Sequence, residues 1–277
     1  MNSNRIRKRR LPSGWYPDNP SEIKSFISNV LGEYSQNDGN NKAIIVPHAG
    51  WSFSGSLAVR AINSLAANPE VVVVIGGHLA PGSYLHYSPE DIFETPLGNL
   101  PAEKDFISRL GSKLILEEDL SSDNTVEVLI PIVKYFNPDS KIVWLRIGSG
   151  NESIELGALI YQIALDLQQK TVVIGSTDLT HYGNNFRFSP VGSGPDAVSW
   201  VKCKNDREII DKMLNLDCKG VLESANSNYS ACSSGGASAA MHFAELSGIS
   251  SGKLIDYFTS YDISPSESFV GYAGIGF

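Results

Sequence analysis

The 277-residue sequence lacks the features that define several large classes of protein. Its three cysteines, Cys203, Cys218 and Cys232, are too few and odd in number for a disulfide framework, which favours a reducing compartment. No apolar stretch approaches the roughly 20 residues that span a bilayer, and the charged N-terminus is followed by no apolar signal region. We therefore expect a cytoplasmic protein that makes no membrane contact.

Positive charge is also scarce, since the formal net charge is -8. A nucleic-acid-binding domain usually carries a basic stripe, so we expect no nucleic-acid partner. The one basic run is Arg5-Ile-Arg-Lys-Arg-Arg10. It could bind an acidic surface, but we interpret residues 1–12 as a flexible, solvated basic arm.

Runs of β-branched residues alternate with helical patterns along the rest of the chain. Four such runs read as strands buried on both faces, namely Ala43–Val46, Val71–Ile75, Lys141–Ile147 and Thr171–Gly175. Helices are predicted at Gly55–Leu65, Pro101–Leu110, Thr125–Phe136, Asn151–Gln168, Asn205–Leu216 and Gly235–Leu246. This alternation predicts an α/β fold, a single domain over residues 1–277 with a mainly parallel central sheet flanked by helices.

Two later segments depart from this alternation. Lys253–Ser260 and Ser268–Gly276 read as further strands that add antiparallel edges.

Residues 184–203 are the least regular stretch and follow a histidine directly. This loop is either a lid over a site or a surface excursion, and the residues favour neither reading.

Three histidines lie in turns that follow the predicted buried strands. His48 ends the run Ala43-Ile-Ile-Val-Pro-His48, His78 follows Gly76-Gly77, and His181 comes a few residues after Thr171–Gly175. Side chains at the carboxyl ends of strands in open α/β sheets point into the crevice where ligands bind. The pattern therefore predicts one shared polar site, although a single such histidine is more often structural.

Two further residues carry reactive groups close to these turns. Asp178 precedes His181 by three residues, a spacing at which a carboxylate can orient an imidazole for acid–base work or simply cap a turn. Cys232 lies among small residues just before the predicted helix Gly235–Leu246. A helix N-terminus favours the thiolate, although an inert buried cysteine is equally consistent with the composition.

Several segments, in order, resemble the motifs of the MEMO family. The strongest is Asn41-Lys-Ala-Ile-Ile-Val-Pro-His-Ala-Gly-Trp-Ser-Phe-Ser-Gly-Ser56. The others are Gly14-Trp-Tyr-Pro17, Asp91-Ile-Phe-Glu-Thr-Pro-Leu-Gly98, Ser176-Thr-Asp-Leu-Thr-His-Tyr-Gly183 and Ser268-Phe-Val-Gly-Tyr-Ala-Gly274. The resemblance runs through nearly the whole chain.

The resemblance implies a fold similar to the class III, LigB-type extradiol dioxygenases, a phosphorylase/hydrolase-like architecture whose enzymes bind non-haem iron. It matches His48, His78 and Cys232 to metal ligands, with the cysteine in place of the dioxygenase glutamate. It matches His181, with Asp178 beside it, to the acid–base group of the pocket. The implied cofactor is one metal ion, first Fe(II), with Cu or Zn as alternatives because a thiolate is a softer ligand than a carboxylate.

One segment departs from the family pattern. Where many members carry two histidines in an "HSxExH" segment, this chain has Asn124 and Leu129, with Glu127 retained. The departure leaves three functions open. The first is a metal-dependent oxidoreductase, and the second is a non-catalytic module that binds a small molecule or peptide, or partners that the resemblance implies to be AMMECR1-like and radical-SAM proteins. The third is a hydrolase using Cys232, His181 and Asp178.

Overall fold

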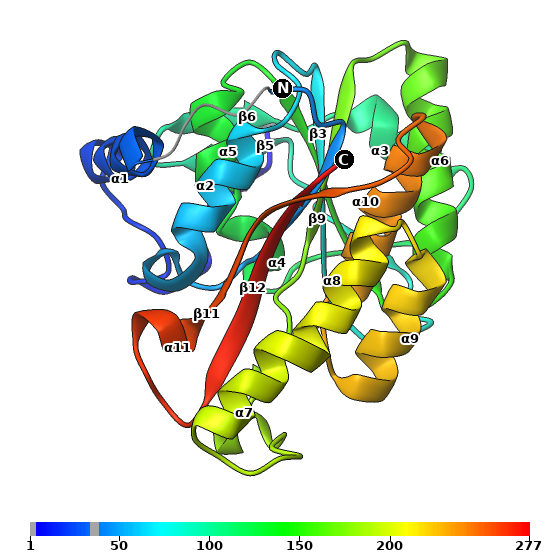
Figure 1. The fold of residues 1–277 in the computed structure, drawn as a ribbon. Helices are drawn as coiled ribbons and strands as arrows, with labels where there is room; N and C mark the ends of the chain where they lie inside the picture. The colour runs from blue at the N-terminus through cyan, green and yellow to red at the C-terminus, as the bar shows by residue number, and fades with distance from the viewer. Residues whose placement is uncertain (1–3, 34–38) are drawn as a thin grey trace.

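A nine-stranded mixed sheet runs through the middle of the molecule, with helices against both of its faces (Figure 1). The structure is a computed structural model that describes residues 4–33 and 39–277. Its central strands are parallel neighbours in the order β2, β9, β3, β8. Their bounds are Ala43–Val46 for β2, Thr171–Ser176 for β9, Val71–Leu79 for β3 and Lys141–Gly148 for β8. All four were predicted as buried strands.

The outer strands make the sheet mixed. The C-terminal strand β12 (Phe269–Gly276) runs antiparallel to β2, to β11 (Lys253–Thr259) and to the short β10 (His181–Tyr182). On the other side, β4 (Leu85–Tyr87) lies antiparallel to β8 and parallel to β7 (Leu116–Glu118). The predicted antiparallel strands are thus confirmed, and parallel pairing dominates only the centre. A second sheet of three strands contains β1 (Ile6–Arg7), β5 (Ile92–Thr95) and β6 (Gly98–Pro101).

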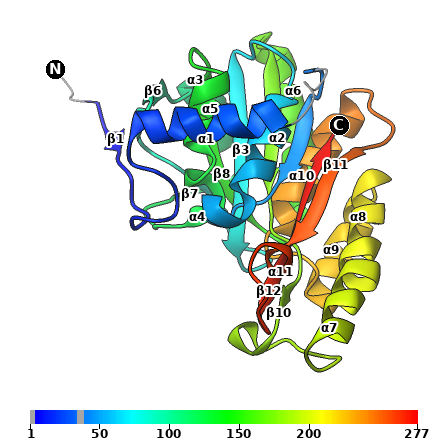
Figure 2. The same cartoon turned by 60° about the vertical axis from the view of Figure 1, so that its left-hand side comes forward.

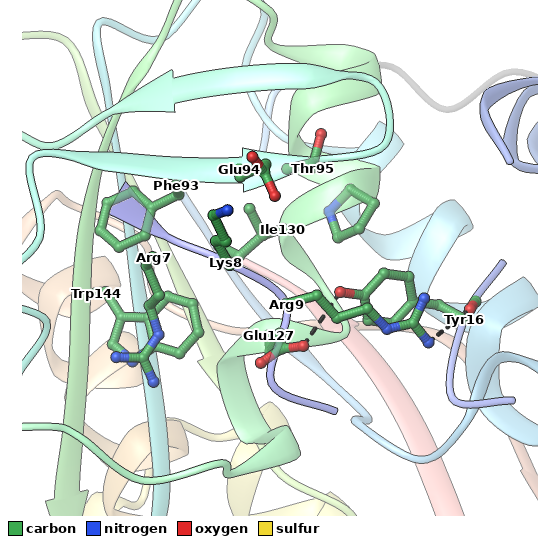
Figure 3. Close-up of a pocket in the computed structure, with 11 residues that line it drawn as sticks. Arg7, Lys8, Arg9, Tyr16, Phe93, Glu94, Thr95, Glu127, Ile130 and Trp144 are labelled. Atoms are coloured by element: carbon green, nitrogen blue, oxygen red, sulfur yellow. Dashed lines mark hydrogen bonds between the residues drawn. The ribbon is translucent and has the colours of Figure 1, made fainter. Parts of the chain in front are cut away.

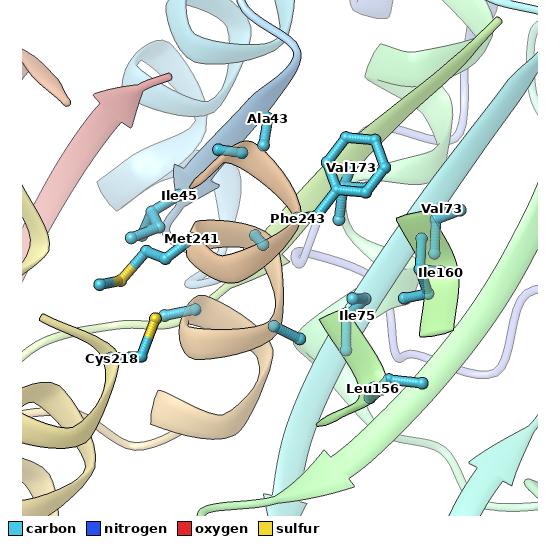
Figure 4. Close-up of a cluster of buried hydrophobic side chains, with 14 of the residues drawn as sticks. Ala43, Ile45, Val73, Ile75, Leu156, Ile160, Val173, Cys218, Met241 and Phe243 are labelled. Carbon is cyan, nitrogen blue, oxygen red and sulfur yellow. The ribbon is translucent and has the colours of Figure 1, made fainter. Parts of the chain in front are cut away.

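Alternate residues of the central strands build two separate cores. Ala43 and Val73 pack with one group of helices, whereas Ile44 and Val72 pack with the other. Each fully buried valine or isoleucine side chain stabilises the fold by about 1.5–3 kcal/mol. Because these side chains point to both faces of the sheet, the fold is stabilised when helices cover both faces. Figure 4 shows part of the core on the first face. Five helices cover this face, namely α3 (Lys104–Gly111), α6 (Glu152–Leu167), α8 (Asp206–Leu214), α9 (Cys218–Asn228) and α10 (Ser234–Leu246). The second is covered by α2 (Ser56–Asn63), α5 (Ile130–Phe136) and α1 (Pro20–Glu33), which lies across the other two in Figure 2.

Helix α10 lies directly against the sheet because glycines face each other at the contact. A Cβ on Gly236 would come 2.4 Å from the carbonyl oxygen of Ile75, and one on Gly175 would come 2.5 Å from the carbonyl oxygen of Gly236. No larger residue fits either position without displacing backbone. This close approach brings the N-terminus of α10 to the carboxyl ends of β9 and β3.

The predicted helix Thr125–Phe136 is divided into two. Helix α4 (Asn124–Glu127) stops, and α5 begins at Ile130 with a proline in its first turn. Pro131 has no backbone N–H to continue the first helix, and it restricts the residue before it. The prediction of one continuous helix was therefore wrong at this point.

Residues 184–203 are largely helical and are not the structureless loop that the sequence predicted. They contain η2 (Asn184–Phe186), α7 (Pro195–Trp200) and most of η3 (Val201–Asn205). The side chain of Trp200 packs with Phe188 and the buried Tyr182 in a small cluster of its own. The segment is thus anchored to the body, and its irregular part is limited to residues 187–194.

The N-terminal segment is packed rather than free. Within it, Arg7 is only 3% exposed, lies 3.7 Å from Asp119 and 3.6 Å from Glu90, and stacks over Trp144 at 4.1 Å (Figure 3). Paired and stacked arginines of this kind fix a chain in place. The expectation of a flexible arm over residues 1–12 was wrong for residues 4–12, and residues 1–3 lie outside the described part. In that part, no helix has the length and apolar character needed to cross a bilayer.

Candidate metal centre

The topology brings three predicted site segments to one edge of the sheet. Strand β9 lies between β2 and β3, and all three run parallel. His48 follows β2, His78 is the penultimate residue of β3, and Asp178 follows β9. Because carboxyl ends of parallel strands meet at the same edge, these side chains converge there.

Cys232 completes a cluster of three possible metal donors. Its Sγ lies 3.3 Å from Nε2 of His48, and one donor atom each from His48, His78 and Cys232 lies within 4.8 Å of the others. The two imidazole rings meet edge to face with centroids 5.1 Å apart. The structure thus brings together the three residues singled out from distant parts of the sequence.

His48 is held on all sides by polar contacts. The residue is 1% exposed, and its Nδ1 lies 2.8 Å from the hydroxyl oxygen of Ser176, at the end of β9. Its backbone N–H donates to Oδ1 of Asp178 at 2.8 Å, and its carbonyl accepts from the amide of Asn124 at 2.9 Å. With Nδ1 engaged, Nε2 is the nitrogen left to face Cys232.

The backbone of His78 has an unusual conformation. It adopts a left-handed conformation with φ of 58°, which is uncommon for residues other than glycine and often marks a functional site. Its Nδ1–H donates to Oδ2 of Asp123 at 2.9 Å, and its side chain is 35% exposed. Just before it, a Cβ on Gly76 would overlap Thr125, and one on Gly77 would lie 2.5 Å from Oγ of Ser233. The two glycines therefore let the segments that carry Asp123 and Cys232 approach His78.

The turn that carries Cys232 is fixed to the end of β9. The backbone N–H of Cys232 donates to the carbonyl of Asp178 at 3.2 Å, and the N–H of Ser233 donates to Oγ1 of Thr177 at 3.1 Å. Helix α10 begins at Ser234, so Cys232 lies beside a helix N-terminus, as predicted. Cys203 is exposed and Cys218 is buried, where burial raises the pKa of its thiol to about 12.

Without a metal the cluster is an ion pair. Burial alone would raise the pKa of Cys232, but the adjacent His48 and His78 lower it well below its ordinary value. Burial likewise opposes the charging of His78, yet Asp123 and Cys232 outweigh it and raise the pKa to about 10. The pKa of His48 is also raised, since Asp178 and Cys232 outweigh its burial. These shifts favour a thiolate beside protonated imidazoles, whose protons a metal ion would displace.

The relation between Asp178 and His181 differs from the expected dyad. Asp178 gives its Oδ1 to the backbone of His48, and its Oδ2 lies 3.9 Å from Nε2 of that ring. The Nδ1–H of His181 instead donates to the carbonyl of Leu179 at 3.1 Å, with the ring edge against Phe186. Burial raises the pKa of Asp178, and the opposing charge of His48 offsets only part of that shift. Asp178 thus supports His48, and His181 takes its orientation from the backbone.

The donor set fits one metal ion. Two ligands with bonds of about 2.0–2.3 Å in a tetrahedral site lie about 3.3–3.8 Å apart. The 3.3 Å between Cys232 and His48 meets this requirement, and the 4.8 Å limit for the whole set needs only a small movement of the partly exposed His78. Two neutral imidazoles and one thiolate leave at least one coordination position for another ligand.

The positions of the missing family histidines have different surroundings. Asn124 adjoins the site through its bond to the carbonyl of His48, whereas Leu129 is fully buried in the apolar core. Glu127 accepts the backbone N–H groups of residues 10 and 11 and the hydroxyl of Tyr16. It lines the cavity of Figure 3, whose volume of about 10 Å³ holds a single water, and none of the candidate metal ligands lines that cavity. Of these three positions, only Asn124 bonds directly to a candidate ligand.

Sequence reasoning gave no role to the residues that hold the ligands. Ser176 follows the predicted strand Thr171–Gly175 and ends the observed β9. Asp123 precedes a short helix as its N-cap, a position that aspartate fills for purely local reasons. Arg146 sits inside β8, where an arginine in an apolar strand is an anomaly that could have drawn attention.

Comparisons with known proteins agree on one family. A model of Memo-like proteins matches residues 7–276. A MEMO1 family protein of Pyrococcus furiosus is 31% identical, with 98% of each chain covered, and one of Methanopyrus kandleri is 30% identical, with 95% of each covered. The crystal structure of an uncharacterized Escherichia coli K12 protein has a TM-score of 0.54 at 13% identity and covers 85% of this chain and 99% of its own. This last likeness concerns the fold alone.

Proposed function

Because the chain belongs to the Memo-like protein family, we propose that it is a metal-binding protein in which His48, His78 and Cys232 hold one ion. The observation that supports the proposal best is the convergence of these donors within 4.8 Å from three separate segments. In both imidazoles Nδ1 is already engaged by a polar partner, which is the usual arrangement of metal-binding histidines.

The resemblance to the class III extradiol dioxygenases favours an oxidoreductase at this centre. A bound ion would supply Lewis acidity and, as iron or copper, redox chemistry; the resemblance favours Fe(II), while the thiolate favours Cu or Zn. Because Nδ1 of His181 bonds to a carbonyl, its Nε2 is the atom that can hold or accept a proton. Replacing His181 with alanine should leave metal content unchanged and abolish turnover.

Metal analysis tests the proposal. Protein purified without chelators, or exposed to Fe(II), Cu(I) or Zn(II), should hold about one ion per chain, as expected for one site of this kind. The variant Cys232→Ala should lose it, whereas Cys203→Ala, which removes an exposed thiol, should retain it. Wild-type protein that takes up none of these metals, or a Cys232→Ala variant that binds as well as wild type, would contradict the proposal.

A second candidate is a non-catalytic module that binds a peptide or a partner protein. Asn124 favours it, since an amide with no proton to transfer bonds to the backbone of His48 where family members carry a histidine. Capture of an AMMECR1-like or radical-SAM partner that survives both His48→Ala and Cys232→Ala would support this reading. The hydrolase reading gains no support, because the imidazole closest to Cys232 belongs to His48.

A further inference from the structure

A chain of charged side chains, partly buried at Asp123 and buried at Arg146, lies behind His78. Oδ2 of Asp123 accepts the Nδ1–H of His78 at 2.9 Å, and Nη2 of Arg146 lies 3.3 Å from Asp123 Oδ2. Arg146 is 4% exposed and belongs to β8, the strand next to β3. A buried arginine of this kind is costly unless its donors are satisfied, so its contacts indicate what it supports.

The carboxylate of Asp123 is fixed through both of its oxygens. Oδ1 accepts the backbone N–H of Thr125 at 2.9 Å and so caps helix α4. Oδ2 is shared between His78 and Arg146. Rotating the carboxylate would break the cap and the ion pair together, so the acceptor that His78 meets is held in one orientation.

Arg146 holds the backbone of the same ligand as well. Its Nε–H donates to the carbonyl of Gly77, the residue before His78, at 2.9 Å. Its Nη1 lies 3.1 Å from Oδ1 of Asp119, a buried carboxylate that also accepts the indole N–H of Trp144 at 3.1 Å. One guanidinium therefore joins the left-handed turn at His78 to the carboxylate that its ring contacts.

We infer that Asp123, held by Arg146, is a positioning residue that fixes the ring of His78 with Nε2 directed to the metal ion. The inference rests on the proposed function. A carboxylate behind a metal-binding imidazole sets the ring orientation and increases its strength as a donor. A purely structural Asp123–Arg146 pair would not need the imidazole, yet the Nδ1–H of His78 lies within hydrogen-bonding distance of that pair.

Two substitutions at Asp123 and one matched control test the role. Asp123→Asn can keep the helix cap but loses the anionic acceptor, and Asp123→Ser keeps a capping oxygen but is too short to reach His78. Both should raise the dissociation constant for Zn(II) by about 10- to 100-fold. The control is Glu127→Gln, which alters another buried carboxylate on α4 that bonds to the N-terminal segment, and it should change the constant by less than about threefold.

The Nδ1–H signal of His78 in nuclear magnetic resonance spectra gives a readout that needs no metal. In wild type and in Glu127→Gln this proton should exchange slowly with solvent, and in both Asp123 variants its signal should be lost. The inference is overturned if the Asp123 variants bind Zn(II) as tightly as the control, or if the protected signal persists in them. Wild-type protein that shows the signal but binds no Zn(II) would instead overturn the proposed function, and with it any role at a metal.

Discussion

The two histidines of the candidate metal centre are held by opposite means. His48 is buried and bonds through its ring to the neutral hydroxyl of Ser176, with its backbone fixed by Asp178 and Asn124. His78 is about a third exposed, and its ring bonds to an anionic carboxylate. His48 is thus enclosed in the core of the protein, whereas His78 lies nearer the surface and contacts a charged partner.

This difference follows from where the two strands end. After β2 the chain leads into α2, which covers one face of the sheet, and His48, two residues past the strand, is already 1% exposed. Strand β3 continues past the end of its pairing with β9, and its penultimate residue His78 is partly exposed. The candidate metal centre therefore has a buried side at His48 and a more exposed side at His78, which contacts charged neighbours.

The largest effect should come from replacing the histidines themselves. His48→Ala removes a buried ring and leaves the hydroxyl of Ser176 without its partner, although Asp178 keeps the backbone N–H, so it should cost about 2–4 kcal/mol of unfolding free energy. His78→Asn, whose new side chain tolerates the left-handed backbone, should cost less. Both should abolish metal binding. Urea denaturation of metal-free protein at pH 8 checks the difference, and equal losses of stability would break the comparison.

A substitution that fills the space between the segments carrying His78 and Cys232 should have the next largest effect. Gly77→Ala would place a Cβ 2.5 Å from Oγ of Ser233, beside Cys232, and should cost about 1–3 kcal/mol as well as weakening metal binding. The control is Gly32→Ala. Gly32 is an exposed residue of α1, and a Cβ added to it would have no other atom within 4 Å, so this substitution should be neutral or slightly stabilising. Thermal unfolding and metal titration of both variants would decide whether the close approach matters.

The metal-free and metal-bound states of the site should differ in the protonation of His78. The pKa of His78 in metal-free protein is about 10, so at pH 8 the ring is protonated and a metal must displace that proton. Zn(II) binding should release at least about one proton per ion at pH 8, and affinity should rise with pH up to about 10. Calorimetry in buffers of different ionisation enthalpy measures this release. Binding without proton release would contradict a protonated His78 that gives up its proton to become a ligand.

The smallest effect should come from the neutral partner of His48. Ser176→Ala removes one hydrogen bond, while Asp178 and Asn124 still fix the backbone. We expect a loss of about 1 kcal/mol in stability and at most about a tenfold loss in Zn(II) affinity. An effect larger than that of Asp123→Asn would reverse the ranking of the two supports.

The fold was predictable where hydrophobic pattern alone decides the structure. The runs that became β2, β3, β8 and β9 are continuous and β-branched, so their burial on both faces could be read directly. The N-terminal segment could not, because its arginines read as solvated until Asp119 and Glu90 are known to face them. The prediction for segment 184–203 was wrong for a similar reason. Its glycines and prolines are typical of a loop, and the sequence does not show which apolar residues Trp200 contacts.

The candidate ligands could be chosen from the sequence, but the residues that contact them could not. His48, His78 and Cys232 stood out through strand ends, glycines and family motifs, and the structure brings them together. Asp123, Ser176 and the actual partner of Asp178 depend on which strands are neighbours. In particular, β9 lies between β2 and β3 although it follows both in sequence, and no local pattern reports that order.

X-ray absorption at the edge of the bound metal tests the central claim most directly. Protein loaded with one equivalent of Zn(II) should show one sulfur at about 2.3 Å and two imidazole nitrogens at about 2.0–2.1 Å, with lighter atoms in the remaining positions. The sulfur should disappear in Cys232→Ser and remain in Cys203→Ala. A wild-type spectrum with only nitrogen and oxygen neighbours would contradict a centre built from His48, His78 and Cys232.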